Sequence, residues 1–409
     1  MSLSAPPAKL RVRPDAESPV SLPDDLITQV LLFSNVKSLM RMRCVCKSWK
    51  SIISHPKFTK LHLKLSTQNP RLILSRRSVH TKIVFLPVRS LIEENPLINL
   101  LNDPLEKVSA KDCRCIFGSC NGLFCCLEWE FSSISEPREF WFRVWNPTMG
   151  TVSKKLGHVC RDMGHYTTYK FAFGYDNSSE TYKAVMLMSD EAENRTIVRV
   201  LSVGDNVWKT ISNFPVSPLL YPYTNQSVSD VVYLNGSLNW LGVRDSFGSI
   251  DTYGWKNING NLFVIVSLDL GTESYTQLMP PHGFIEMSAV EPSICILKDC
   301  LCFSHDYRRT EFVIWQMKKF GVEESWTQLL KISYQNLQSI DRDLIDLKYL
   351  QWFPLHLSDC GDTLILANDQ ERQAILYNLR LNKGKRSRIA DEVQWFSAMI
   401  YVESLVCDI

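Results

Sequence analysis

Residues 22–62 read LPDDLITQVLLFSNVKSLMRMRCVCKSWKSIISHPKFTKLH, and this stretch decides how the N-terminal part of the chain folds. Three apolar stripes at helical spacing follow one another in it. Asp24-Asp25 place negative charge where the first turn of a helix favours it. Ser34-Asn35 offer a side-chain oxygen that caps a second helix, and His55-Pro56 ends the third. The pattern therefore predicts three short helices.

Three helices in so short a stretch cannot enclose a hydrophobic core of their own. Much of their apolar surface must be covered by the rest of the same chain or by another protein. The side chains concerned are Leu26, Ile27, Val30, Leu31, Val36, Leu39, Met40, Val45, Trp49, Ile52 and Ile53.

The order of these signals resembles the F-box, the helical module that docks onto a Skp-type adaptor in cullin-based ubiquitin ligases. The resemblance is carried by Leu22-Pro23, by the apolar stripe over 26–31, by VKSL at 36–39 and by CVCKSW at 44–49. The last two runs are most like the large plant F-box families. Those families usually have Leu-Pro before the second run, where this chain has Ser34-Asn35. This departure changes a turn and not a contact face. The alternative to an F-box is an ordinary amphipathic subdomain that packs on its own chain.

The resemblance implies which side chains contact the adaptor, and through the adaptor a cullin. For Trp49 a second role stays open, because its ring can instead hold the three helices together. The expected adaptor-binding residues are Leu22, Pro23, Leu26, Ile27, Val30, Leu31, Val36, Leu39, Val45, Trp49 and Ile53.

Composition narrows the class of protein. The 409 residues suffice for two or three domains, and 45% apolar with 22% charged residues is the balance of a soluble globular protein. A net charge of +2 does not indicate binding to nucleic acid or to an anionic membrane. No apolar run is long enough to span a bilayer. Residues 1–20 lack the apolar segment of a signal peptide and are expected to be a disordered leader. We expect an intracellular protein, in the cytoplasm, the nucleus or both.

The cysteines favour neither disulfides nor a metal. Their number, thirteen, is odd, and no Cys-x-x-Cys occurs. The dense run from Cys113 to Cys126 contains no histidine, which argues against a zinc cluster there. We therefore predict no metal and no organic cofactor.

From about Arg71 onward, alternating apolar residues replace the helical pattern. Turn residues recur at Gly118, Gly174, Gly236, Asp299 and Gly361, at intervals of 56, 62, 63 and 62 residues. After each one comes a second strand–turn–strand unit; these units span 142–156, 197–211, 263–278, 312–329 and 374–389. A near-fixed period with four strands per repeat is typical of a β-propeller.

The two ends of this region offer one more blade. Residues 71–90 and 395–406 together supply strands that close the ring, which removes free sheet edges. The predicted fold class is therefore α+β: a small three-helix F-box at 21–65, followed by an all-β propeller-like domain of five to six blades at 70–409. An irregular pair of β-sandwiches is the alternative.

This second region resembles the plant F-box-associated interaction domain, which is often called kelch-like although the paired glycines of kelch repeats are absent here. The resemblance is carried by 121–123 (NGL), 145–147 (WNP), 174–185 and 234–240 (LNGSLNW). Both resemblances together imply a non-catalytic substrate receptor of an SCF-type ubiquitin ligase, whose propeller binds an unknown target protein.

Catalysis by the chain itself finds no support in the sequence. No Gly-x-Ser-x-Gly, His-Glu-x-x-His, Walker or Gly-x-Gly-x-x-Gly motif occurs. His305-Asp306 and His356 are more typical of turn or core residues than of a catalytic pair. We expect target contacts in irregular loops outside the repeats, and name Tyr221, Tyr223, Phe247, Tyr253 and Trp255 as candidates.

Two other functions stay open at this point. One is an F-box protein that binds the adaptor or another partner without delivering a target for degradation. The other is a propeller enzyme or glycan-binding module whose N-terminal helices only pack against it. An acidic or metal-binding site at the mouth of the propeller would favour the latter.

Overall fold

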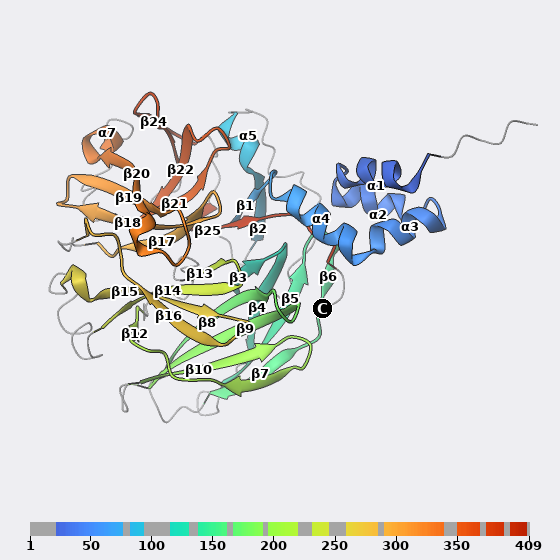
Figure 1. The fold of residues 1–409 in the computed structure, drawn as a ribbon, viewed down its shortest axis with the longest axis horizontal. Helices are drawn as coiled ribbons and strands as arrows, with labels where there is room; N and C mark the ends of the chain where they lie inside the picture. Colours follow the sequence, from blue (N-terminus) through green and yellow to red (C-terminus); the bar gives the residue numbers. More distant parts are fainter. Residues whose placement is uncertain are drawn as a thin grey trace, which may run out of the picture.

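The computed structural model describes residues 22–76, 82–93, 115–130, 138–161, 167–190, 195–219, 231–244, 259–284, 290–338, 350–368, 374–387 and 393–406. These residues form a group of helices attached to one side of a ring of six β-sheets (Figure 1). The expected leader, residues 1–20, lies outside the described residues. Within the described part of the chain, no helix combines the length and apolar character needed to cross a membrane.

The N-terminal module contains α1 (Asp24–Leu32), α2 (Val36–Met42), α3 (Lys47–Ser54) and α4 (Pro56–Ser66). As expected, Asn35 caps α2 by accepting a hydrogen bond of 2.8 Å from the amide of Ser38. His55-Pro56 ends α3, but Pro56 then becomes the first residue of a fourth helix, which the sequence analysis missed. Proline is well tolerated there because the first N–H of a helix has no intrahelical partner.

The sheets are numbered here as blades in chain order, and all their strand pairs are antiparallel. Blade 1 contains β3 (Cys115–Cys120), β4 (Leu123–Glu130), β5 (Arg138–Asn146), β6 (Thr151–Val152) and β7 (Leu156–Arg161). Blade 2 contains β8 (Thr167–Asp176), β9 (Thr181–Asp190), β10 (Arg195–Ser202) and β11 (Val207–Thr210). Blade 3 contains β12 (Ser217–Pro218), β13 (Val231–Leu234), β14 (Ser237–Val243), β15 (Phe263–Asp269) and β16 (Ser274–Leu278).

Blade 4 contains β17 (Ser293–Leu297), β18 (Cys300–Tyr307), β19 (Glu311–Met317) and β20 (Trp326–Ser333). Blade 5 contains β21 (Trp352–Leu357), β22 (Thr363–Asn368), β23 (Ile375–Asn378) and β24 (Lys383–Arg386), and blade 6 contains β1 (Arg71–Arg76), β2 (Lys82–Pro87) and β25 (Val393–Tyr401). Short helices α5 (Val88–Ile92) and α7 (Tyr334–Gln338) follow blade strands, as do the 3-10 turns η6 (Gly260–Leu262) and η7 (Glu323–Ser325). The predicted propeller is confirmed, with six blades.

Two of the turn positions inferred from the repeat, Gly118 and Gly174, lie inside strands. Gly118 belongs to β3, and the turn after it is made by Asn121 and Gly122, both with positive φ. A Cβ at Gly118 would come within 2.7 Å of the Cβ of Phe173 on β8. Glycine is therefore required at this position because the inner strands of blades 1 and 2 approach closely, and not because of a turn.

The ring closes as the sequence predicted. β25 pairs with β1, with Tyr401 opposite Arg71 and Met399 opposite Ile73. The ring of Tyr401 then stacks on Phe124 of blade 1 at a centroid distance of 5.1 Å and meets Phe85 of blade 6 edge-on at 5.4 Å. An aromatic cluster thus joins the last blade to the first.

The antiparallel order places the connections at two opposite ends of the ring. The inner strand of a blade is the one that lines the centre of the ring; in blades 1 to 5 it is β3, β8, β13, β17 or β21. The turn after each of these five strands lies at the same end as the junction between the helical module and β1. This end holds the tight turns at 121–122, 235–236 and 298–299, whose residues have positive φ. The connections between successive blades leave from the other end. The helical module therefore occupies the end of the propeller that carries the tight turns.

Asn146 ties the C-terminal tail to blade 1. Its Nδ2 donates to the carbonyl oxygens of Ser404, at 3.0 Å, and Val406, at 2.9 Å, and its Oδ1 accepts from the amide of Met149 at 3.1 Å. The side chain is fully buried.

We predict that Asn146→Ala lowers the free energy of unfolding by about 2–3 kcal/mol, because buried carbonyl groups lose their donors. Denaturant unfolding of the full chain measures this, with the exposed Asn69→Ala as control. Equal midpoints for both variants would contradict the assigned role.

Candidate functional site

An exposed apolar stripe runs along α1. Leu22, Leu26, Val30 and Phe33 expose 59%, 47%, 69% and 83% of their surface. Leu26 and Val30 are four residues apart on one face of the helix, and Leu22 and Phe33 continue that spacing just before and just after it. Together with Val45, which is 66% exposed, they leave the module with an unusual amount of apolar surface in water. We call these five side chains the α1 stripe.

The opposite side of the same helices forms the core of the module. Leu31, Val36, Leu39 and Ile53 are buried, and they pack with Phe58 of α4 and Leu405 of the C-terminal tail. All four were expected to contact the adaptor. In this structure the four side chains pack inside the module, and their contact with an adaptor stays a prediction.

The other expected contact residues are at least partly accessible. Pro23, the residue before α1, is exposed, whereas Ile27 and Trp49 are half-buried and pack against the module core. Trp49 therefore helps to hold the helices together, which is the second role that its sequence position left open. Phe33 was missed by the sequence analysis, although it continues the spacing of Leu22, Leu26 and Val30.

The helical module carries an excess of positive charge. Residues 22–66 contain eight lysines and arginines but only two acids, Asp24 and Asp25. Lys37, Arg41 and Lys47 are exposed. The module is thus strongly basic, in a chain whose net charge is only +2.

The module is attached to the propeller through apolar contacts. Leu405, only 5% exposed, belongs to the module core, and Met149 of blade 1 packs against it. Lys60 of α4 also forms an ion pair of 2.5 Å with Glu180, but both side chains are mostly exposed, so the pair contributes little. The shared core holds the two parts together.

A cleft of about 780 Å³ lies between the module and the propeller. Its walls come from residues 32–35, α4, α5 and blades 5 and 6, and they include Phe33, His62, Arg71, His356 and Glu403. Arg71 and Glu403 form an ion pair of 2.8 Å. Burial lowers the pKa of His356, against the opposing influence of Asp359, so this side chain is neutral near neutral pH.

The central channel of the propeller is narrow and mostly apolar. Its volume is about 200 Å³, and inner-strand residues such as Phe117, Phe173 and Phe353 line it. No charged side chain is among the described residues that line it. At the end remote from the module, burial raises the pKa of Glu291 well above its ordinary value.

The candidate target-binding residues Tyr221, Tyr223, Phe247, Tyr253 and Trp255 lie outside the described residues. The strands that flank them are described. The first two residues belong to the connection between β12 and β13, and the other three to the connection between β14 and β15. Both connections leave from the end of the ring that is remote from the helical module.

Comparison with known families covers nearly the whole chain. Residues 20–61 match the family model described as F-box domain, and residues 72–407 match the one described as F-box associated beta propeller domain. Both resemblances noted in the sequence are thereby confirmed.

Curated relatives from Arabidopsis thaliana match most of this chain. The F-box/kelch-repeat protein At3g23880 is 24% identical over 327 residues, covering 77% of this chain and 80% of the relative. F-box protein CPR1 is 23% identical over 410 residues, covering 94% of this chain and 89% of the relative.

Among solved structures, the nidogen/laminin complex superimposes with a TM-score of 0.37 at 12% identity, covering 82% of this chain and 99% of that one. An acylaminoacyl peptidase from Pyrococcus horikoshii gives a TM-score of 0.34 at 10% identity, covering 64% of this chain and 37% of that one. Scores at this level bear on neither the fold nor the function.

We predict effects of very different size on stability for two leucines of α1. Leu31→Ala should lower the free energy of unfolding by about 2–5 kcal/mol, since it opens a cavity in the module core. Leu26→Ala should change it by less than about 0.5 kcal/mol, because that side chain is largely in water already. Thermal unfolding of the two variants beside the unaltered chain measures the difference, and a large loss with Leu26→Ala would contradict the exposed position of the stripe.

Proposed function

We propose, because this chain belongs to the family of F-box proteins with an F-box-associated β-propeller domain, that it recruits a target protein to a cullin-based ubiquitin ligase. The helical module binds a Skp-type adaptor, and through it a cullin. The propeller binds the target. The ubiquitin transfer itself is carried out by the partner proteins, and this chain acts inside the cell as a non-catalytic receptor.

The α1 stripe is the observation that carries this proposal. The chain buries one side of the module against its own tail, through Leu405, yet leaves the stripe on the other side uncovered. Fully burying a large apolar side chain contributes about 1.5–3 kcal/mol. Five such side chains, partly buried already, supply on the order of 5–10 kcal/mol before the costs of association. Because association itself costs several kcal/mol or more, other contacts must add to this apolar term in a stable complex.

The charge of the module favours an acidic partner surface. Exposed cations such as Lys37 and Arg41 on α2 lie close in sequence to the stripe. In such an arrangement the apolar contact supplies affinity, and the surrounding charge raises the association rate and restricts which partners bind. We therefore propose that the adaptor surface carries acids around an apolar groove.

We propose that the adaptor and the target bind at opposite ends of the ring. The module occupies the end with the tight turns, so an adaptor and a target need not compete for space if the target binds at the other end. The described strands that flank the candidate residues Tyr221, Tyr223, Phe247, Tyr253 and Trp255 meet these segments at that remote end. Holding a target beside a charged conjugating enzyme raises its effective concentration there, which is how a non-catalytic receptor accelerates the reaction.

We predict that Val30→Asp and Phe33→Asp each weaken binding of a Skp-type adaptor by at least about 10-fold, because a carboxylate replaces buried apolar surface at the contact. The full chain is co-expressed with the adaptor, and the complex is measured by size exclusion and by titration calorimetry.

Val207→Asp is the matched control, since Val207 of β11 is 66% exposed on the propeller and should bind the adaptor normally. If Val207→Asp lost binding to the same extent, or if the well-folded unaltered chain bound no adaptor, the stripe would not be the docking surface. Turnover of proteins captured by the propeller then distinguishes delivery for degradation from binding alone.

A further inference from the structure

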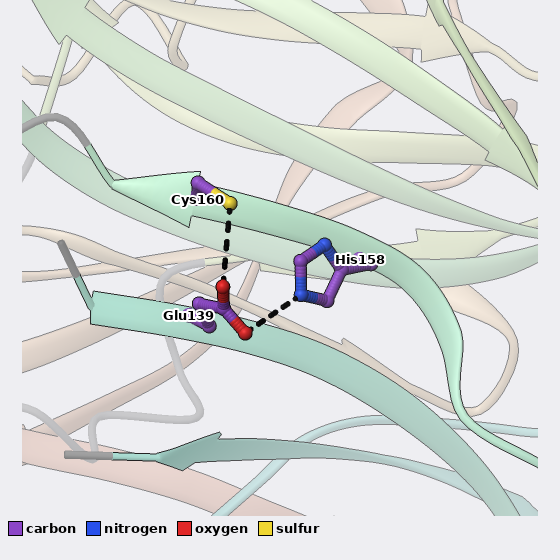
Figure 2. A group of neighbouring side chains, drawn as sticks. All are labelled: Glu139, His158 and Cys160. Carbon is purple, nitrogen blue, oxygen red and sulfur yellow. Dashed lines mark hydrogen bonds and ion pairs between the residues drawn. The ribbon is translucent and has the colours of Figure 1, made fainter. Parts of the chain in front are cut away.

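Three potential metal ligands of different chemistry meet at the edge of blade 1. Glu139 lies on β5, and His158 and Cys160 lie on β7 (Figure 2). Nε2 of His158 is 3.1 Å from Oε2 of Glu139, and Sγ of Cys160 is 3.8 Å from Oε1 of the same carboxylate. The three donor atoms lie within 4.8 Å of one another, and all three side chains are exposed.

The sheet register explains why these side chains meet. Glu139 is directly opposite Cys160 in the pairing of β5 with β7, and such pairs point to the same face of a sheet. His158 lies two residues before Cys160, so it shares that face. All three groups thus lie on paired strands, with His158 at the irregularity of the β5–β7 pairing between Phe140 and Phe142.

The side chains on this face change from aromatic to acidic along the strands. Near the helical module it carries Phe124 and Trp145, which pack in the aromatic cluster with blade 6. Toward the other end it carries Glu130, which is directly opposite Glu139 in the pairing of β4 with β5. A second carboxylate thus lies beside Glu139, on the side away from β7, and adds negative charge for a cation.

We propose that Glu139, His158 and Cys160 bind a zinc ion. Thiolate, imidazole and carboxylate are the three ligand types that zinc takes from proteins, whereas magnesium and calcium take oxygen ligands. Zinc–ligand bonds of 2.0–2.3 Å in a tetrahedron place neighbouring ligand atoms about 3.3–3.8 Å apart. The observed separations need only small side-chain rotations to reach this geometry.

Binding displaces protons in a defined way. The Cys160 thiol transfers its proton to solvent as the sulfur–zinc bond forms, and His158 binds through neutral Nε2, so affinity rises with pH. Three protein ligands leave the fourth tetrahedral position for water or for a side chain of a bound protein. The site lies at the end of the ring remote from the helical module, although the zinc proposal does not depend on where the target binds.

The test uses the full chain, reduced and stripped of metal with a chelator. Co²⁺ is titrated in as the probe, because a cobalt–thiolate bond absorbs in the near ultraviolet, and Zn²⁺ is then added to displace it. The chain contains thirteen cysteines, so the decisive readout is the difference between the unaltered chain and Cys160→Ser. Thermal unfolding without metal verifies that each variant is folded.

We expect one equivalent of Co²⁺ with thiolate absorption, absent in Cys160→Ser. Loss of an outer partner of a metal site usually weakens binding by about 10–100-fold, so removing a ligand by His158→Ala or Glu139→Gln should weaken it by at least about 10-fold. Cys360→Ser and His282→Ala alter an exposed cysteine and an exposed histidine elsewhere, and should leave the titration unchanged.

Two results would overturn the proposal. One is unchanged absorption in Cys160→Ser, which would assign the metal to other cysteines. The other is binding in the unaltered chain that is no tighter than in the variant lacking all three ligands, which would indicate an adventitious ion only.

Discussion

The pairing of β25 with β1 is the constraint on which the rest of the structure depends. A propeller blade has apolar surface on both faces, and only a closed ring covers all of it. This chain closes the ring with strands from its two ends, so β1 must return to lie beside β25. The aromatic contacts of Tyr401 with Phe85 and Phe124 then join the last blade to the first. Closure also fixes where the residues on either side of these strands emerge.

The position of the helical module follows from that closure. β1 begins and β25 ends at the same end of the ring, so the segment before β1 and the tail after β25 emerge side by side. The tail therefore reaches the module, and Leu405 is buried among Leu31, Val36 and Leu39. Asn146 holds the tail in this path through the carbonyls of Ser404 and Val406. The module is fixed to the ring by a shared core, which sets its orientation relative to the far end of the propeller.

Much of this architecture could be predicted from the sequence because it depends on patterns among residues that are close together in the chain. The recurring Asn, Asp and Gly residues and the second strand pairs revealed the repeat, and the strands at 71–90 and 395–406 indicated closure. The helix that begins at Pro56 was missed because proline was interpreted only as a helix end, although it is equally suited to a first position. Gly118 was assigned to a turn, because the sequence alone does not distinguish a glycine required by a turn from one required by a close neighbouring strand.

The site was predicted less completely, since burial depends on contacts between distant residues. Leu31 and Leu26 belong to one apolar run, and only the packing of Leu405 shows that the first is core and the second is surface. Phe33 could have been found from its spacing to Val30. Glu139 and Cys160 could not have been associated, because their meeting depends on the register between β5 and β7, in which a shift of one residue would place them on opposite faces.

The shared core also links the stability of the ring to the binding of a partner by the module. Leu405 contributes to the module core only when the tail follows its path past blade 1, and that path exists only in the closed ring. A free-energy loss in ring closure therefore reduces the population of modules that are competent to bind, even when no contact residue has changed. By the same linkage, a partner that binds only the ordered module stabilises the closed ring in proportion to its concentration and affinity. The helices and the propeller thus share a core, and this shared core links the folding of the two parts.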